Sequence, residues 1–259
     1  SFKKTTSFYW NKYRIDRYND ALEHPENAYP YAFLKEIKKY TGSLADKKIL
    51  DIGAGTGAFA IPLLEEGAYV TAIDSSFHMI HSLVDRTQEY GLENLNCIIS
   101  PFHRAKTNRH DISISAFSGG STKTIEGIIK MKDLTNEYCF IISSFENQDE
   151  NFKRDILYKR LDRPIHKQRT HKGTLADTLR MLDYLEYIYD YKEIEYEFSQ
   201  YFLSFDEALT FFMDRFHIDV QEEKVILKEF LKEFLIAEHG EYVFKNIKKS
   251  YIISIESKF

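Results

Sequence analysis

The amino-acid sequence predicts an α/β fold: a doubly wound, seven-stranded, mostly parallel sheet with helices on both faces. Strand-like and helix-like segments alternate through the first half of the chain, a pattern typical of parallel sheets built from βαβ units. A short apolar strand also runs directly into a glycine-rich turn, which a helix follows. The 259 residues, 43% hydrophobic and 29% charged, suit one elaborated globular domain of this class.

The seven expected strands are short runs rich in β-branched or aromatic residues. They lie at 48–52, 69–74, 96–100, 111–117, 138–145, 193–202 and 250–256. The expected helices carry apolar residues at helical spacing, and glycine follows the first three of them as a common C-terminal stop. They lie at 29–41, 56–66, 77–90, 124–134, 174–191, 206–215 and 222–237.

The regular alternation of strand and helix breaks after the fifth strand, where the chain becomes polar and basic and then largely helical. We therefore expect a single domain over residues 1–259 with two additions. Residues 1–28 would form an N-terminal lid, and residues 146–215 a helical insertion that covers the substrate.

Composition excludes several classes of protein. No apolar run approaches the roughly 20 residues that span a bilayer, so we expect no membrane partner. Cys97 and Cys139 lie far apart and match no metal or redox spacing, which favours a reducing cytoplasm. The net charge of −5 argues against a nucleic-acid partner.

The glycine-rich turn, residues 53–57, is the main candidate for a ligand site. Glycines at alternating positions let the backbone turn sharply and approach a ligand closely, and the start of the next helix presents free N–H groups. This pattern alone does not select the ligand. With Ala58 the run also satisfies the dinucleotide fingerprint G-x-G-x-x-G/A.

Two acidic residues beside this turn favour S-adenosylmethionine (SAM). Asp51 precedes the first glycine by two residues, where a carboxylate can face the ammonium of an amino-acid ligand. Asp74 ends the second strand, where a carboxylate can accept hydrogen bonds from both ribose hydroxyls. NAD carries the ribose but lacks such an ammonium, so Asp51 is the residue that separates the two ligands.

The run Asp51-Ile-Gly-Ala-Gly-Thr-Gly57 resembles motif I of the class I SAM-dependent methyltransferases. Ala72-Ile-Asp-Ser-Ser-Phe-His-Met79 resembles the segment after the second strand of that family. The resemblance implies a Rossmann-like methyltransferase fold that binds SAM and releases S-adenosylhomocysteine (SAH). Within the class, the chain resembles uncharacterised bacterial enzymes presumed to act on small molecules. The residues that would hold the methionine end are Asp51, Gly53, Ala54, Gly55 and Gly57, with Asp74 on the ribose and Ser75 and Met79 near the adenine.

The chain departs from the family after the third strand, where Ser100-Pro101-Phe102 stands in place of an acidic residue. The Pro-Pro motif of base-amine methylases is missing from residues 115–120, and no carboxylate cluster at the ends of strands four and five marks a Mg²⁺ site. We therefore expect metal-independent, in-line methyl transfer. His103 is the candidate general base; the alternative is a solvent-exposed loop histidine.

Aromatic residues identify candidate substrate contacts. Tyr9, Trp10 and Tyr13 precede the first core helix and suit a lid over the cofactor, or else a helix packed on the sheet. Phe117 ends the fourth strand at the expected site edge. The region 184–212 is rich in tyrosine and phenylalanine, which would be mostly core or homodimer surface, with some side chains forming pocket walls.

Two basic segments follow strands three and five, and both are expected at the substrate edge of the sheet. Their arginines suggest that the methyl acceptor is anionic, although they also suit a solvated loop. The arginines in question are Arg104, Arg109, Arg163 and Arg169.

The sequence thus favours a methyltransferase that acts on a small molecule. An RNA or protein methyltransferase and a non-catalytic SAM-binding protein stay open as alternatives. A dehydrogenase is disfavoured, because the one Tyr-x-x-x-Lys spacing that could form its dyad, Tyr31 to Lys35, precedes the glycine turn.

Overall fold

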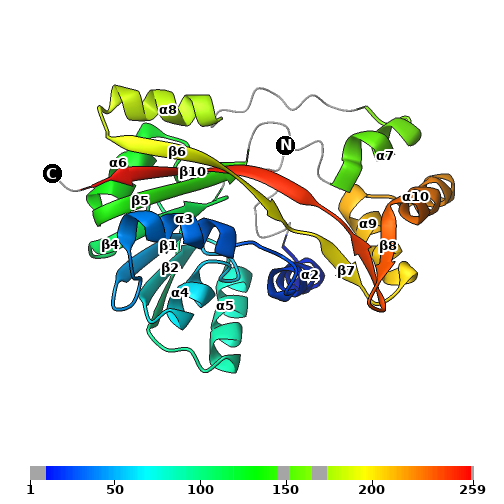
Figure 1. The fold of residues 1–259 in the computed structure, drawn as a ribbon, viewed down its shortest axis with the longest axis horizontal. Coiled ribbons are helices and arrows are strands. Elements are labelled where there is room, and N and C mark those ends of the chain that lie inside the picture. The colour runs from blue at the N-terminus through cyan, green and yellow to red at the C-terminus, as the bar shows by residue number, and fades with distance from the viewer. Residues whose placement is uncertain (1–9, 119, 145–151, 165–173, 258–259) are drawn as a thin grey trace.

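The computed structural model describes residues 10–118, 120–144, 152–164 and 174–257. Its main sheet has seven strands in the order β3-β2-β1-β4-β5-β10-β6 (Figure 1). Only β10 runs antiparallel to its neighbours β5 and β6. The predicted seven-stranded, mostly parallel fold is therefore confirmed. The strands are β1 (Lys48–Ile52), β2 (Tyr69–Asp74), β3 (Leu95–Ile99), β4 (His110–Ala116), β5 (Thr135–Ser144), β6 (Tyr189–Glu197) and β10 (Ile247–Glu256).

Helices cover both faces of this sheet, because successive strand residues point to opposite sides. Ile49 packs on one face with buried residues of α3, α4 and α5. Leu50 packs on the other face with α6 and α8. The helices are α2 (Lys12–Glu23), α3 (Tyr31–Thr41), α4 (Ala60–Glu65), α5 (Phe77–Glu89), α6 (Ile125–Asp133) and α8 (Leu175–Tyr184).

A smaller antiparallel sheet, ordered β7-β9-β8, lies beyond one end of the main sheet, where β6 and β10 extend toward it (Figure 1). It packs with three helices around a phenylalanine-rich core that includes Phe202, Phe212, Phe230 and Phe244. The elements are α7 (Arg154–Arg160), β7 (Gln200–Phe202), α9 (Phe205–Phe216), α10 (Gln221–Phe234), β8 (Leu235–Glu238) and β9 (Glu241–Phe244).

The small sheet corrects the expected helix 222–237. Helix α10 ends at Phe234, and Leu235 already has extended backbone angles. His239 and Gly240, both with positive φ, then turn the chain back into β9. Two consecutive residues with positive φ suit the tight turn of a β-hairpin, whose twist matches that of its strands.

The expected insertion at 146–215 is also redrawn, because β6 falls inside it and belongs to the main sheet. The expected helix 174–191 stops at Tyr184, and the expected strand 193–202 is divided into β6 and β7. Asn27 fixes this division, since its side chain accepts a hydrogen bond from the Ser199 N–H and donates one to the Ser199 carbonyl. The expected helix 56–66 begins only at Ala60, after the glycine turn.

Helix α2, part of the expected lid, lies between the main sheet and the small sheet (Figure 1). Arg14 forms a two-pronged ion pair with Asp214 of α9, with N···O distances of 2.8 and 3.1 Å. Arg17 binds Glu207 and the Tyr201 carbonyl, each at 2.6 Å. These contacts join the N-terminal segment to the smaller sheet. No helix in the described ranges has the length and apolar character needed to cross a bilayer.

Candidate functional site

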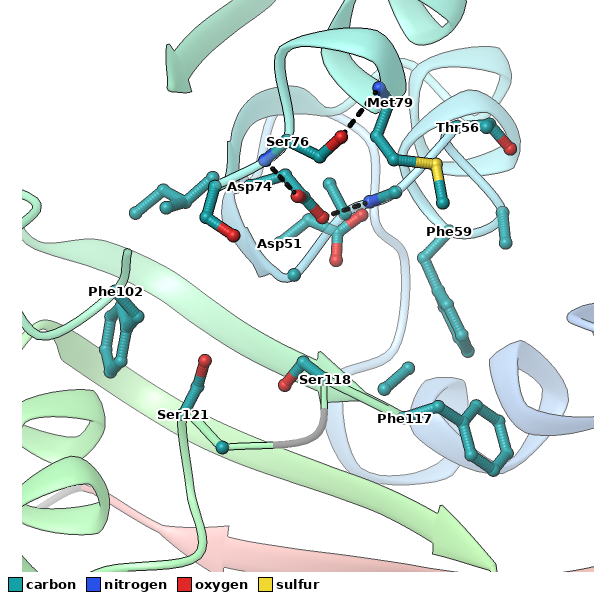
Figure 2. Close-up of a pocket in the computed structure, with 18 of the residues that line it drawn as sticks. Asp51, Thr56, Phe59, Asp74, Ser76, Met79, Phe102, Phe117, Ser118 and Ser121 are labelled. Carbon is teal, nitrogen blue, oxygen red and sulfur yellow. Dashed lines mark hydrogen bonds between the residues drawn. The ribbon is translucent and has the colours of Figure 1, made fainter. Parts of the chain in front are cut away.

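A cavity of about 920 Å³ opens at the carboxyl ends of the parallel strands. In open α/β sheets ligands bind at this edge, where the connecting loops meet. The glycine turn, the end of β2 and the loops after β3 and β4 surround one half of it (Figure 2). Aromatic residues from α2, β6 and the segment before α3 surround the other half.

The glycine turn holds the first half of the cavity. Gly53 has φ +74°, and its N–H donates to the Ile73 carbonyl at 2.7 Å, which joins the turn to the end of β2. A side chain at Gly53 would collide with Ser118 of the loop after β4. Gly55 and Ala54 line the cavity, whereas Gly57 is not among its lining residues and faces Leu83 and Ile61. The predicted contact of Gly57 with a ligand therefore becomes a role in shaping the turn.

Asp51 is a buried acid of this half whose pKa is strongly raised. Its side chain lies in the cavity wall near the carboxyl end of β1, and the residue is only 2% exposed. Its Oδ2 atom has no hydrogen-bond partner among the described residues. Burial raises the pKa of Asp51 to about 7, and the neighbouring Asp74 adds to this, while a hydrogen bond from the Ala60 backbone opposes it. A buried carboxylate with one oxygen left without a partner is a site for a cationic ligand group.

The raised pKa of Asp51 makes a prediction about stability. Unfolding returns this acid to its ordinary value, so between about pH 4 and pH 7 the folded chain holds a proton that the unfolded chain has lost. The contribution of Asp51 is thus full below pH 4 and is lost as the pH rises through 7. In the absence of ligand, Asp51→Asn should gain stability relative to the wild type across this interval and reach a plateau above it. Urea unfolding at several pH values measures the difference; a difference that does not change with pH would contradict it.

Asp74 lies beside Asp51 at the glycine turn (Figure 2). Its two carboxylate oxygens accept hydrogen bonds from the Gly55 N–H at 3.0 Å and the Ser76 N–H at 2.8 Å. Ser76 caps α5 by accepting from the Met79 N–H, and both side chains line the cavity with Ser75. Asp74 therefore joins the turn to the start of α5 and keeps further lone pairs for a ligand.

The second half of the cavity is an aromatic chamber. Tyr29 packs against Phe117, Tyr196 and Phe198, with ring centroids 5.6–5.7 Å apart. Burial raises the pKa of Tyr29 well above its ordinary value, so its phenol stays neutral. The walls, called the aromatic chamber below, are Trp10, Tyr18, Tyr29, Phe117, Tyr196 and Phe198.

Most of the predicted cofactor contacts lie together in one cavity: Asp51, Gly53, Ala54, Gly55, Asp74, Ser75 and Met79. Of the predicted lid and substrate residues, Trp10, Phe117 and His103 also line it. Tyr13 does not line it; its environment includes Arg17, Asp214 and Glu207, on the side of the small sheet. Tyr9 and Arg169 lie outside the described residues.

The prediction that the two basic segments lie at the substrate edge is wrong for Arg104, Arg109 and Arg163, the arginines among them that the structure describes. Arg163 is bound by Glu223 and by the Phe216 carbonyl, beside the small sheet. Arg109 donates to the Asp133 carbonyl at the end of α6, beside the start of β4 and so at the edge opposite the cavity. Arg104 is exposed and does not line the cavity. Each position followed an expected strand, but a loop can direct its side chains away from the strand ends.

Sequence analysis missed several residues of the chamber, namely Tyr18, Tyr29, Tyr196, Phe198 and Lys248. The aromatic richness of 184–212 pointed to some of them without separating Tyr196 and Phe198 from core residues such as Phe202 and Phe212. Lys248 gave no signal, since it stands in a run of basic residues near the C-terminus. Within the described ranges no three His, Cys, Asp or Glu side chains could hold a metal ion, and metal independence stays a prediction.

Comparison with known proteins agrees with this geometry. Residues 49–126, from β1 to the start of α6, match the family model described as "Methyltransferase domain". The chain is 25% identical over 147 residues to ribosomal protein L11 methyltransferase of Shewanella sediminis, a match covering 56% of this chain and 48% of the relative. An uncharacterized protein of Haemophilus influenzae is 33% identical over 82 residues, covering 32% and 29%. The matches thus span less than half the length of these relatives.

Solved structures of low sequence identity share the fold. YcgJ of Bacillus subtilis is 14% identical and superposes with a TM-score of 0.56, covering 88% of this chain and 99% of the other. Magnesium protoporphyrin IX methyltransferase of Synechocystis, solved with bound SAH, is 13% identical with a TM-score of 0.56, covering 96% of each chain. With its glycine turn and its seven-stranded sheet, this chain has a Rossmann-like methyltransferase fold, and its residues 49–126 match a methyltransferase domain.

Proposed function

We propose that this protein transfers the methyl group of SAM to a small molecule held in the aromatic chamber. The observation that carries the proposal is one cavity with two unlike halves. One half presents the unpartnered Oδ2 atom of Asp51 and the carboxylate of Asp74 beside a glycine turn. The other half is a chamber of aromatic side chains.

The residues of the first half suit SAM. Asp51 would hold the ammonium of the methionine end, Asp74 the ribose hydroxyls, and Met79 would lie beside the adenine. SAM supplies an activated methyl group, so the protein's task is to orient the acceptor and exclude water. Trp10 and Tyr18 from the N-terminal segment would contribute to that exclusion. His103 lines the cavity and remains the candidate to take a proton from an acceptor that carries one.

Incubation of the full chain with methyl-labelled SAM and a bacterial extract tests the proposal. After fractionation we expect label in the small-molecule fraction. Label only in RNA would favour an RNA methyltransferase, and label only in protein would favour a protein methyltransferase. SAM binding without any transfer would favour a non-catalytic SAM-binding protein.

The choice of cofactor gives a separate prediction. Asp74→Ala should weaken SAH binding by about thirtyfold, because a charge-assisted hydrogen bond to ribose contributes roughly 2 kcal/mol. The wild type should show no measurable affinity for NAD. Calorimetry of both ligands measures this, with Asp85→Ala as the control, since Asp85 is exposed on α5 and pairs only with His81 among the described residues. Tight NAD binding without SAH binding would refute the assignment of the cofactor.

A further inference from the structure

Among the described residues that line the aromatic chamber, Lys248 is the cation without an ion pair. This lysine lies near the start of β10, opposite Tyr196 of β6. Because β10 runs antiparallel to β5, its first residues project past the carboxyl end of that strand and reach the cavity. Its Nζ atom lies 5.0 Å from the centroid of the Phe198 ring.

No carboxylate neutralises Lys248 among the residues that the structure describes. It has no ion pair or hydrogen bond there, and its nearest charged influence is Arg215, also positive. The acids of the cavity lie elsewhere: Asp51 and Asp74 flank the glycine turn, and Glu126 lies in the first turn of α6 on the other face of the sheet. Burial and Arg215 lower the pKa of Lys248 to about 8, as expected for a cation without a partner.

The other lysine of the cavity serves as an internal comparison. Lys130 donates to the backbone carbonyls of Phe102 and Ala105 at 2.6 and 2.7 Å, so its charge is already used to hold the loop after β3. Lys249, which follows Lys248 on β10, points away from the cavity toward Glu193 and Glu195. Lys248 differs from both because its charge has no carboxylate or carbonyl partner among the described residues.

We propose that Lys248 anchors a carboxylate of the methyl acceptor, whose flat apolar body packs between the rings of the aromatic chamber. An anion beside Lys248 would complete an ion pair where water is largely excluded, and this gives the interaction its strength. Tyr29 and Tyr196 are buried, Tyr18 is half-buried, and the pKa of each phenol is raised, so near neutral pH they add hydrogen-bonding groups and no negative charge. This inference rests on the proposed function and narrows its substrate class to aromatic or similarly flat acids.

The test uses the full chain saturated with SAH and two matched pairs of probes: benzoate with benzamide, and cinnamate with cinnamamide. Each amide has the shape of its acid without the charge. Calorimetry gives the affinity, and quenching of Trp10, the single tryptophan of the chain and a wall of the chamber, places the probe. We expect the wild type to bind the acids at least tenfold more tightly than the amides.

Lys248→Met should abolish this preference, weakening the acids by about tenfold to a hundredfold and leaving the amides unchanged. Lys248→Arg should retain most of the preference, and Lys249→Met is the matched control that should match the wild type. If Lys248→Met does not fold, Lys248→Gln replaces it. Phenyl phosphate separates the two anion chemistries: binding of phosphate but not of the carboxylates would overturn the carboxylate assignment.

Three outcomes keep this inference separate from the proposed function. Absence of SAH binding by the wild type would refute the proposed function. Normal SAH binding by every variant, with acids and amides bound equally, would refute only the role of Lys248. An acid preference that survives in Lys248→Met would have the same meaning.

Discussion

Replacing Asp51 with asparagine is expected to lower the affinity for SAM and SAH by about a hundredfold at pH 8. At this pH the wild-type side chain is ionised, because its pKa of about 7 lies below it. The ligand ammonium would then lose a charged partner in a buried setting, where such an interaction contributes roughly 3 kcal/mol. The Asn side chain keeps the shape of the wall, so the loss reports charge rather than packing.

5′-Methylthioadenosine is the matched control ligand, since it keeps the nucleoside but lacks the amino-acid end. Its affinity should be the same for the wild type and for Asp51→Asn. Calorimetry at pH 8 compares the three ligands. Equal weakening of 5′-methylthioadenosine would show that Asp51 supports the turn instead of binding the ammonium.

The cofactor half of the cavity was predictable because its residues are close in sequence. Asp51 and Gly53 lie on one strand and its turn, and Asp74 ends the strand that pairs directly with β1. Parallel pairing brings the ends of β1 and β2 to one edge, so spacing alone was enough to place both carboxylates together. The effect of burial and of Asp74 on the pKa of Asp51 could be seen only in the structure.

The substrate half depends on contacts between distant residues. Lys248 reaches the chamber because of its register with Tyr196, and most of the 51 intervening positions fold separately into the small sheet and two of its helices. Arg163 shows the converse, since its basic neighbours suggested a ligand role while Glu223, 60 residues away, binds it. Composition shows where charged residues stand in the sequence, but not which residue or ligand pairs with each of them.

The small sheet was missed because its local pattern is ambiguous. The apolar spacing of α10 continues through Leu235 and Ala237, and only the turn at His239 and Gly240 marks the hairpin. Four-residue strands carry too few alternations to outweigh an adjoining helical stripe. The His-Gly pair between apolar runs was the available signal.

Gly53→Ala is expected to destabilise the protein by about 2 to 5 kcal/mol and to abolish SAH binding. Its φ of +74° disfavours any L side chain, at a cost of roughly 1–2 kcal/mol. The added Cβ would also collide with Ser118, whose Cα would lie 3.2 Å away, so backbone must move. The turn can move only by weakening its bond to the Ile73 carbonyl.

Gly91→Ala separates these two costs, because Gly91 has φ +63° but open space around its Cβ position. It should lose only about 1–2 kcal/mol and keep full SAH affinity. Urea unfolding without ligand, followed by SAH calorimetry under native conditions, compares both variants with the wild type. Since the backbone strain is shared, the additional loss in Gly53→Ala measures how closely the loop after β4 packs on the glycine turn. Equal losses of stability in the two variants, with SAH binding intact, would mean that the loop after β4 moves at little cost and that Ser118 does not fix the position of the glycine turn.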